Sequence, residues 1–301
     1  MASQPAKPRW LKVRMPSSPR YHQIKARARQ LSLSTVCEEA RCPNIGECWE
    51  GGTATFMVMG DTCTRGCRFC AVKTSRKPAA LDPQEPANVA NAIQEMELDY
   101  VVITSVDRDD VADGGAGHFA ECIRQVRIQS PKTMVEVLIP DFSGHIGHLL
   151  KVIEAQPDVI AHNVETIERL TKTVRDPRAG YQQTMDVLQH IKQIDASRFT
   201  KSSIMVGLGE THEEVLETMR ALRDVNCDFL TLGQYLQPTQ KHLKVDDFIP
   251  PERFKEWETL GLEMGFKYVA SGPLVRSSYK AGEFFIRRYL EKHRTEQGVA
   301  S

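Results

Sequence analysis

The sequence of 301 residues lacks several features that would assign it to a particular class of protein. Its longest apolar runs, such as Tyr100 to Ile103, are far shorter than the roughly 20 residues that a membrane-spanning helix needs. The formal net charge is zero, so the chain as a whole has no electrostatic attraction for nucleic acid. No apolar core of a secretory signal peptide is present near residue 1. We therefore expect a protein that binds neither nucleic acid nor a membrane.

Acidic residues are absent from the first 37 positions, whereas the whole chain contains 39 of them. The same stretch contains eight basic residues, which are Lys7, Arg9, Lys12, Arg14, Arg20, Lys25, Arg27 and Arg29. An acid-free, Arg-rich segment is found in transit peptides, on surfaces that attract an acidic partner and on solvated helix faces. The residues alone leave these three interpretations open.

The composition is that of an ordinary globular protein, with 41% hydrophobic and 26% charged residues. Its length suffices for one large domain or two smaller ones. The eight cysteines do not indicate a disulfide framework, because such frameworks belong to small secreted domains. We expect instead a reduced, metal-binding protein of the cytoplasm. Cys122 and Cys227 are expected to be small buried apolar side chains, and His162, near a strand end, is the histidine of most interest.

Six of the eight cysteines lie between residues 37 and 70, in two triplets of different spacing. The first triplet is Cys37, Cys42 and Cys48, and the second is Cys63, Cys67 and Cys70. A structural zinc site closes with four ligands, and a cluster that only carries electrons is normally held by four cysteines. Three thiolates on one short loop leave a position on iron where another molecule or an unusual ligand can bind.

Short apolar, β-branched runs alternate with longer amphipathic segments after the cysteines. Strands are expected at 54–59, 100–105, 134–139, 159–163, 202–206 and 229–233, and helices at about 86–97, 116–129, 145–155, 165–174, 181–194 and 212–225. Six such units predict an α/β fold, an incomplete (β/α)6 parallel barrel, since a complete eight-unit barrel needs more chain. We expect this barrel at about 51–270, between an N-terminal extension (1–50) and a C-terminal tail (271–301).

Polar or glycine-containing segments follow four of the expected strands, and three of them hold candidate site residues. These segments contain Asp107 and Arg108, then Asn163 and Glu165, and then Gly207 and Gly209. In parallel α/β barrels the reactive site lies at the carboxyl ends of the strands. Because the loop of Cys63, Cys67 and Cys70 follows the first strand, we expect it to open onto the same face.

The segment from Cys63 to Cys70 resembles the cluster-binding loop of the radical S-adenosylmethionine (SAM) superfamily. Gly66 lets the backbone curl, and Arg65 and Arg68 are expected to favour thiolate over thiol. The resemblance implies that the three cysteines hold a [4Fe–4S] cluster, whose fourth iron binds the amino and carboxylate groups of SAM. One electron then cleaves the sulfonium and gives a 5′-deoxyadenosyl radical. Without the resemblance, a zinc knuckle or a redox-active cysteine pair remains open.

The same resemblance implies contacts with SAM. Phe69 and the turn that contains Gly207 and Gly209 would lie near the adenine. Four polar residues would hold the amino, carboxylate or ribose groups, and these are Asp107, Arg108, Asn163 and Glu165. Each of the four also suits a helix cap or a loop salt bridge.

The other triplet, within residues 37–48, resembles the auxiliary-cluster motif of lipoyl synthases. Further segments continue that resemblance, at 7–12, 102–110, 205–211, 232–238 and 272–279. It implies that two sulfur atoms are inserted at C6 and C8 of an octanoyl chain amide-linked to a lysine of a carrier protein. The carrier would be a lipoyl domain of a 2-oxoacid dehydrogenase or a glycine cleavage H protein. Two SAM molecules would be used, and a second [4Fe–4S] cluster would be consumed as the sulfur donor.

In that family a serine of an Arg-Ser-Ser-Tyr motif is the fourth ligand of the second cluster. Here this is Ser277 or Ser278, and the resemblance points to Ser278. A hard alkoxide should leave iron more readily than a thiolate, which suits a cluster that is consumed. By their sequence alone, the two serines suit a turn and Arg276 suits a pair with a carboxylate.

The resemblance also implies partners: an electron donor such as ferredoxin or flavodoxin, and an iron–sulfur cluster assembly or repair protein. Since the similarity begins by Lys7, we expect that the basic N-terminus is not a removable transit peptide and instead steers an acidic carrier domain. Two rival hypotheses are a different sulfur-inserting enzyme, similar to biotin synthase, and a non-catalytic electron carrier or cluster scaffold.

Overall fold

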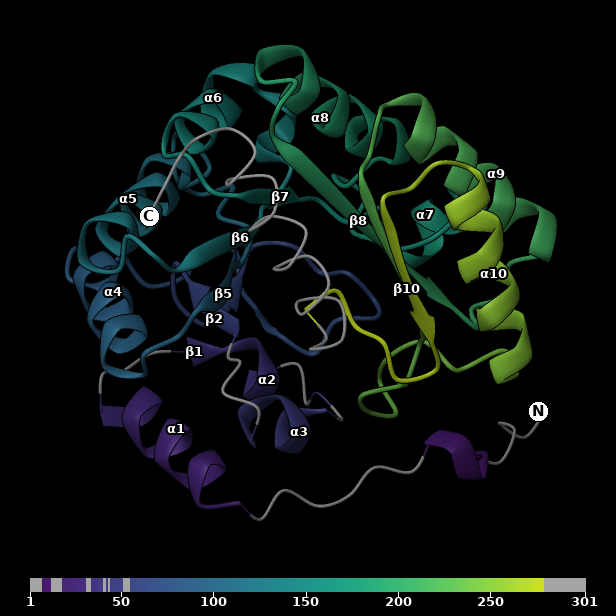
Figure 1. Cartoon of the computed structure of the whole chain (residues 1–301), viewed down its shortest axis with the longest axis horizontal. Helices are drawn as coiled ribbons and strands as arrows, with labels where there is room; N and C mark the ends of the chain where they lie inside the picture. Colours follow the sequence, from purple (N-terminus) through teal and green to yellow (C-terminus); the bar gives the residue numbers. More distant parts are fainter. Residues whose placement is uncertain are drawn as a thin grey trace.

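The computed structural model describes residues 7–11, 18–30, 34–39, 42, 44–50 and 55–278. Their largest feature is a curved sheet of eight strands that surrounds a central space, with most helices on its outside (Figure 1). In spatial order the strands are β1 (Ser34–Thr35), β2 (Thr55–Val58), β5 (Tyr100–Ser105), β6 (Met134–Leu138), β7 (Val159–Ala161), β8 (Phe199–Val206), β9 (Phe229–Gln234) and β10 (Tyr268–Gly272). From β2 to β10 all neighbours are parallel, and the short β1 is antiparallel to β2. The predicted incomplete parallel barrel is confirmed.

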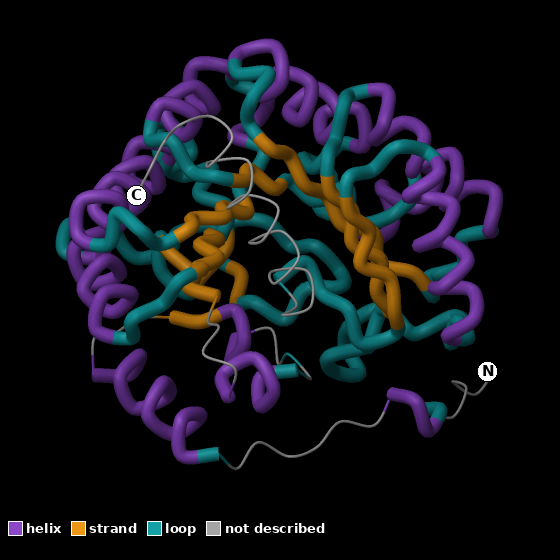
Figure 2. Tube along the Cα trace, viewed as in Figure 1, coloured by secondary structure: helices purple, strands orange, loops and turns teal. Residues whose placement is uncertain are grey.

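Helices follow the parallel strands and cover the sheet, as the tube in Figure 2 shows. They are α4 (Glu85–Glu95), α5 (Ala116–Gln129), α6 (Ile146–Glu154), α7 (Glu168–Val174), α8 (Tyr181–Ile194), α9 (His212–Asp224) and α10 (Pro251–Glu263). Local sequence fixes several starts: α4 and α10 have proline in the first turn, and Thr211 with Glu214 forms a capping box at α9.

The N-terminal segments carry smaller elements beside the barrel. These are η1 (Arg9–Leu11), α1 (Pro19–Gln30), α2 (Val36–Glu39) and α3 (Ile45–Glu50). Two further short strands, β3 (Thr62–Cys63) and β4 (Lys73–Thr74), pair across the cysteine loop, and η2 (Phe142–Gly144) follows β6.

The sequence analysis missed one strand–helix unit, α10 with β10, so the barrel has seven parallel strands rather than six. The reason is the composition of β10: its Ala-Ser-Gly end has low strand propensity. Pairing with β9 nevertheless holds it in register, from Tyr268 opposite Phe229 to Gly272 opposite Gly233. Strand β8 also begins earlier than expected, at Phe199, because Thr200 and Lys201 are buried although they are polar.

One end of the barrel interior is filled. A ring of apolar side chains packs there, comprising Tyr100, Val102, Met134, Val159, Phe199 and Phe229. Beside this ring the Lys201 Nζ lies 2.8 Å from the Glu136 Oε1, with both side chains at most 2% exposed, and the Tyr100 hydroxyl donates to Glu136 Oε2. Because this end is packed, the usable space lies at the opposite end, where the strands finish.

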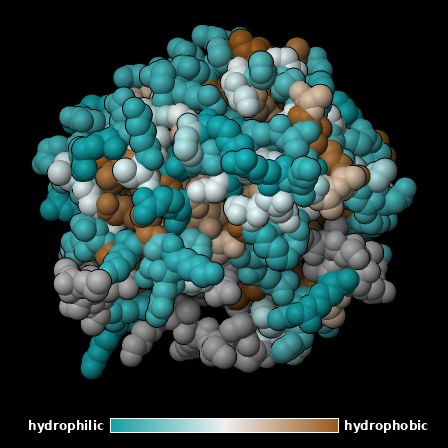
Figure 3. Space-filling model, turned by 180° about the vertical axis from the view of Figure 1, so that it is seen from behind, coloured by the Kyte–Doolittle hydropathy of each residue, from teal (hydrophilic) through white to brown (hydrophobic). Residues whose placement is uncertain are grey.

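The face seen in Figure 3 is mostly hydrophilic, and its apolar side chains appear in separate small patches. Scattered apolar residues of this kind are normal on protein surfaces. Among the described residues, no helix combines the length and the apolar character that crossing a bilayer requires.

Candidate functional site

A chamber of about 540 Å³ lies at the carboxyl ends of the strands. It brings together residues that are far apart in the sequence. The predicted site residues that line it are Cys42, Cys63, Cys67, Phe69, Cys70, Asp107, Asn163, Glu165 and Ser278. The expected common face is therefore present, and it receives residues from both chain ends as well as from the barrel.

Backbone N–H groups point at two sulfur atoms of the cysteine loop. The N–H groups of Arg65 and Asp107 lie 3.4 and 3.3 Å from Cys63 Sγ, and that of Asp176 lies 3.3 Å from Cys67 Sγ. Hydrogen bonds to cysteine sulfur are a means by which proteins hold and tune iron–sulfur clusters. The geometry of the loop therefore fits a cluster held by Cys63, Cys67 and Cys70.

Burial raises the pKa of these thiols, to about 12 for Cys63 and about 11 for Cys67 and Cys70. The expectation that Arg65 and Arg68 favour the thiolates is therefore wrong. The guanidinium of Arg65 is taken up by carboxylates, and that of Arg68 donates to the carbonyl of Thr173 at 3.1 Å. These thiols would therefore lose their protons on binding a metal ion, as coordinating thiols do.

Arg65 anchors the cysteine loop to two neighbouring loops. Its side chain is only 3% exposed, and its Nη1 and Nη2 donate to both carboxylate oxygens of Asp141 at 2.6 and 2.7 Å. The same guanidinium contacts Asp109 at 2.8 Å and Asp107 at 3.3 Å. Burial alone would lower the pKa of Arg65, but these carboxylates raise it above its usual value, so the guanidinium stays charged.

A second anchor comes from the segment between α7 and α8. The Asp176 carboxylate accepts the N–H of Gly66 at 2.8 Å, and Arg178 donates to the carbonyl of Thr64 at 2.8 Å. Arg178 also bonds Asp176 at 2.8 Å, which lowers the pKa of that carboxyl. The protein's own residues thus hold the loop from two sides.

Arg175 and Asn163 present unused polar atoms in this part of the chamber. Arg175 is 8% exposed and donates through Nη1 to Thr184 Oγ1 at 3.0 Å, but its buried Nε has no partner within the described chain. Asn163 donates to Glu165 Oε1 at 3.1 Å, and its buried Oδ1 likewise has no partner there. Buried polar atoms normally find partners, so an unpaired donor and acceptor fit a bound molecule with both kinds of group, such as an amino acid.

The carboxyl of Glu165 lies in the same group. Burial raises its pKa, and the charge of Arg175 and the hydrogen bond from Asn163 oppose that rise. The sequence analysis missed Arg175, because it follows a helix rather than a strand. The run of charges in Arg175-Asp176-Pro177-Arg178 was the available signal.

Asp107 and His162 complete the polar wall. Burial raises the pKa of Asp107 to about 6, and its Oδ2 lies 3.7 Å from the Cys63 sulfur. Burial lowers the pKa of His162 to about 4, so the imidazole is neutral. Its Nδ1 is 2.9 Å from the carbonyl of Ile139, which can only accept, so the proton is on Nδ1 and Nε2 accepts from Thr184.

Arg108, which was expected to contact SAM, is absent from the described lining of the chamber. Its guanidinium is 2.8 Å from Asp110 and donates to the carbonyls of Met59 and Ala79 at 3.1 and 2.9 Å. With its donors used in this way, Arg108 holds loops together.

The glycine turn after β8 is also absent from the described lining. At Gly207, where φ is +97°, a Cβ would lie 2.0 Å from Gln234 Nε2 and 2.5 Å from the carbonyl oxygen of Asp247. Glycine is needed there because the chain's own segment packs against it. Gly209 has φ +98°, and the carboxylate of Glu210 accepts the N–H groups of Gly207 and Leu208. Packing therefore accounts for the glycine in this turn, and the predicted contact with adenine stays a prediction.

The structure gathers the first cysteine triplet only in part. Cys42 lines the chamber, and burial raises the pKa of its thiol, opposed by the N–H of Asn44 and the charge of Arg276. Cys48 is 6% exposed, packs in the apolar core with Trp49 and is not in the described lining. The side chain of Cys37 lies outside what the structure describes.

Ser277 and Ser278 both line the chamber, so the geometry does not choose between them. Arg276 donates to the carbonyl of Val275 at 2.6 Å, and burial lowers the pKa of its guanidinium, opposed by Cys42. Within the described residues, no carboxylate pairs with Arg276. The carboxylate pair considered from sequence alone is therefore not what places this arginine.

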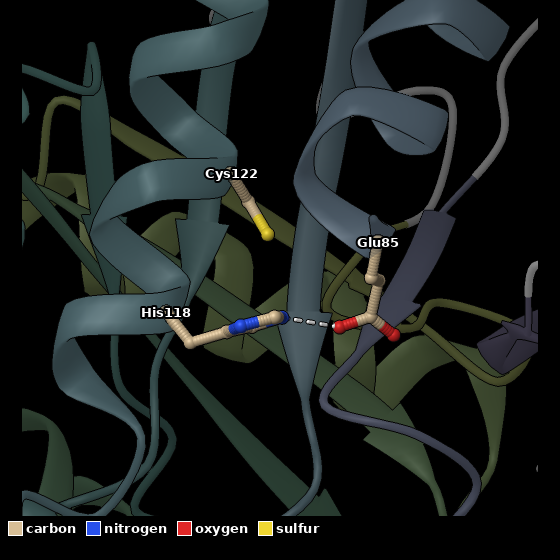
Figure 4. Close-up of side chains that lie close together, drawn as sticks. All are labelled: Glu85, His118 and Cys122. Atoms are coloured by element: carbon tan, nitrogen blue, oxygen red, sulfur yellow. Dashed lines mark hydrogen bonds and ion pairs between the residues drawn. The ribbon is translucent and has the colours of Figure 1, made fainter. Parts of the chain in front are cut away.

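Another group of possible metal ligands lies outside the described lining of the chamber. Glu85 of α4 and His118 of α5 are 2.6 Å apart, with Cys122 beside them (Figure 4). The carboxylate of Glu85 already accepts the N–H groups of Met59 and Gly60 at 2.7 and 3.2 Å. We therefore assign this group to holding the turn after β2. Cys122 is fully buried, as expected.

Cys227 is also fully buried and donates to a backbone carbonyl, so the expectation of a small buried side chain is confirmed.

Comparisons with known proteins agree with this site. The family model of the radical SAM superfamily matches residues 57–222, and that of the N-terminal domain of lipoyl synthase of the radical SAM family matches residues 2–42. A lipoyl synthase of Myxococcus xanthus is 57% identical over 297 residues, which cover 99% of each chain. A mitochondrial lipoyl synthase of Branchiostoma floridae is 58% identical over 294 residues, covering 96% of this chain and 78% of its own.

Solved structures with low sequence identity share the fold. Methylornithine synthase superposes with a TM-score of 0.54 at 13% identity, covering 91% of this chain and 92% of its own. A maturase of the [FeFe]-hydrogenase has a TM-score of 0.56 at 13% identity, covering 71% and 50%. With the cysteine loop, the barrel and full-length relatives in agreement, this chain belongs to the lipoyl synthase family of radical SAM enzymes.

Proposed function

We propose that this enzyme inserts two sulfur atoms, at C6 and C8, into an octanoyl group carried on a lysine of a carrier protein. It would use SAM and two [4Fe–4S] clusters, the second of which supplies the sulfur. One observation carries the proposal: the cysteines of the SAM-type loop line the same chamber as Cys42 and the serine pair.

The substrate explains why a radical enzyme is needed. C6 and C8 of an octanoyl chain carry neither an acidic proton nor a leaving group, so acid–base or nucleophilic catalysis cannot functionalise them. When bound, the first cluster and SAM supply a 5′-deoxyadenosyl radical, which removes a hydrogen atom.

The protein's own residues position this chemistry. Cys63, Cys67 and Cys70 would hold the cluster, while Arg175, Asn163 and Glu165 would bind the carboxylate, amino or ribose groups of SAM. Phe69 lines the chamber beside them and would cover the adenine. The packed opposite end of the barrel closes the interior, which limits access of water to the reacting groups.

For the second cluster we propose Cys37, Cys42, Cys48 and Ser278 as ligands. Cys42 and Ser278 are supported by their place in the chamber. Cys48 has no such support, since it packs in the apolar core. Iron and sulfide analysis of anaerobically purified protein tests this assignment: about eight irons per chain are expected for two [4Fe–4S] clusters, and about four would overturn the second cluster.

We propose that the basic N-terminus attracts an acidic carrier domain, since Lys7 lies at the chamber and no acidic residue precedes Glu38. Replacing Lys7, Arg9, Lys12 and Arg14 with Gln should weaken carrier binding more at low salt than at high salt. Lys12 and Arg14 lie outside the described residues. A loss of affinity that does not depend on salt would contradict the steering role.

We also propose a ferredoxin or flavodoxin as the electron donor, an iron–sulfur assembly protein that rebuilds the consumed cluster, and a location in the cytoplasm. These proposals rest on the need for electrons, sulfur and reduced thiols. Cell fractionation with a tagged chain tests the location, and a purely organellar signal would overturn it.

An anaerobic assay with SAM, a reductant and an octanoylated lysine peptide tests the function. We expect 5′-deoxyadenosine together with a peptide that has gained two sulfur atoms. If 5′-deoxyadenosine forms while the peptide gains no sulfur, a different radical enzyme is indicated. Reduction of the clusters without SAM cleavage would indicate an electron carrier or scaffold.

A further inference from the structure

We propose that Asn44 is a positioning residue that holds the C-terminal strap, defined as residues 272–278, at the chamber, and thereby places the serine that binds the second cluster. The inference rests on the proposed function. Asn44 is 3% exposed, and its side-chain Nδ2 donates to the carbonyl oxygen of Leu274 at 2.6 Å across 230 residues of sequence.

Among the described residues, two backbone contacts also hold the strap after β10. The N–H of Val275 turns back to the carbonyl of Gly272 at 3.0 Å. The carbonyl oxygen of Val275 then lies against Gly233 at the end of β9, where a Cβ would be only 2.1 Å away. This close approach fixes one point of the strap on the barrel, and Asn44 fixes the residue just before it on the N-terminal segment.

Asn44 also lies on the cysteine side of the same site. It follows Cys42 by two residues in the chain, while its side chain bonds the strap three residues before Ser277. One residue therefore links a proposed cysteine ligand to the segment that carries the proposed serine ligand. Cys42 and Ser278 belong to opposite ends of the chain, so such a link sets their separation.

The chemistry of a consumed cluster makes this link useful. A serine that leaves iron can no longer hold its own segment in place by coordination. An amide-to-carbonyl hydrogen bond does not depend on the metal, so it holds the strap before the serine binds and after it leaves. Losing the donor would also leave the part-buried Leu274 carbonyl without this partner, which costs free energy.

Limited trypsin cleavage after Arg276, followed by mass spectrometry of the full chain, measures how firmly the strap is held. Asn44→Asp keeps the shape but replaces the amide donor with an acceptor, and should raise the cleavage rate about fivefold to tenfold. Asn44→Ala should do the same, while Asn44→Gln, which keeps a donor, should stay closer to wild type. The control is Asn91→Ala, an exposed position on α4. Equal rates in the wild type and Asn44→Asp would overturn the inference.

A spectroscopic readout follows the second cluster alone. In a chain with Cys63, Cys67 and Cys70 replaced by Ala, the visible absorbance should report only that cluster. Adding Asn44→Asp should make a chelator bleach it several times faster, and Asn44→Gln should restore most of the resistance. Unchanged bleaching would show that Asn44 does not position the serine.

The two experiments test the positioning role of Asn44 separately from the proposed function. If the triple cysteine variant binds no iron, the proposed second cluster fails, whereas the trypsin result still decides whether Asn44 holds the strap. If the cluster is present and the strap is cut at the same rate in every variant, the function stands and the positioning role falls.

Discussion

The two cysteine regions of this protein are built in different ways. The loop from Cys63 to Cys70 takes all its thiols from one short stretch, and Arg65 and Asp176 anchor it to the barrel. The region around Cys42 draws its proposed ligands from both chain ends, and Asn44 joins these segments through one side-chain hydrogen bond.

This difference matches the different tasks that we propose. A cluster that cleaves SAM in every turnover benefits from a rigid binding site, because the cleavage geometry must be the same each time. A cluster that is taken apart needs a ligand that can leave and a segment that stays near. The chain ends of this protein provide that arrangement, and the barrel provides the fixed one.

Replacing one cysteine of each region tests the proposed division of tasks most strongly. Cys63→Ala should lower the formation of 5′-deoxyadenosine at least about a thousandfold, because the electron reaches SAM through that cluster. Cys42→Ala should leave SAM cleavage within a few-fold of wild type and abolish sulfur insertion. Chromatography of both products checks this, and equal loss of SAM cleavage in the two variants would contradict the division of tasks.

Removing the anchor of the first loop should be costly for stability. Arg65→Ala leaves the buried carboxylate of Asp141 uncompensated, so we expect a loss of about 3–5 kcal/mol in the free energy of unfolding. Arg276→Ala, its counterpart in the second region, removes no carboxylate pair seen in the described residues and should cost less. Chemical denaturation measures both. A larger loss of unfolding free energy for Arg276→Ala than for Arg65→Ala would contradict the assignment of the Cys63–Cys70 loop as the more firmly held region.

Arg175 tests whether the wall beside the first loop binds SAM. Arg175→Gln removes a buried charge with an unpaired donor, so the Kd for SAM should rise about 10- to 100-fold, which corresponds to a charged hydrogen bond of about 1.5–3 kcal/mol. Arg68→Gln is the matched control, since its guanidinium donates to a backbone carbonyl instead. Calorimetry on the cluster-loaded protein would disprove the role if both variants bind SAM alike.

The most gradual effect concerns pH. Burial lowers the pKa of His162 to about 4 from its usual 6.5, so the unfolded chain binds a proton that the folded chain excludes. Stability from this group is complete above pH 6.5 and is lost as the pH falls towards 4, at up to about 1.4 kcal/mol per pH unit. Asp107, whose pKa is raised to about 6, acts in the opposite direction.

Because His162 and Asp107 change stability in opposite directions, the wild type must be compared with His162→Asn, which can keep the hydrogen bond to Ile139. The variant should lose less stability between pH 6.5 and 4, by about 3 kcal/mol in total. Denaturation curves at several pH values give the two slopes. Parallel slopes would mean that His162 is not held neutral.

Much of the barrel was predictable, because hydrophobic period and strand length are local properties. The run Tyr100–Ser105 and the helix Tyr181–Ile194 have the expected bounds. Strand β10 was not predictable, since its residues have low strand propensity. Its extended conformation depends on backbone pairing with β9.

The candidate site was predictable only at the level of motifs. Strand ends indicated Asp107, Asn163 and Glu165, which line the chamber, and also Arg108 and Gly207, which are absent from its described lining. Whether a polar residue at a strand end faces the chamber depends on which partners take its hydrogen bonds. Those partners, Asp110 for Arg108 and the loop at Asp247 for Gly207, come from the packing of the whole chain.

The sequence by itself determined the chemistry that this protein can perform, since the spacing of its cysteines decides which thiols share a loop and the strand–helix alternation decides the barrel. Only the tertiary structure decided that Arg65 is neutralised by Asp141, that Arg175 keeps an unpaired donor and that Asn44 reaches Leu274. The physical reason is range: periodicity and propensity act over a few residues, whereas hydrogen bonds and burial join residues that only the folded chain brings together.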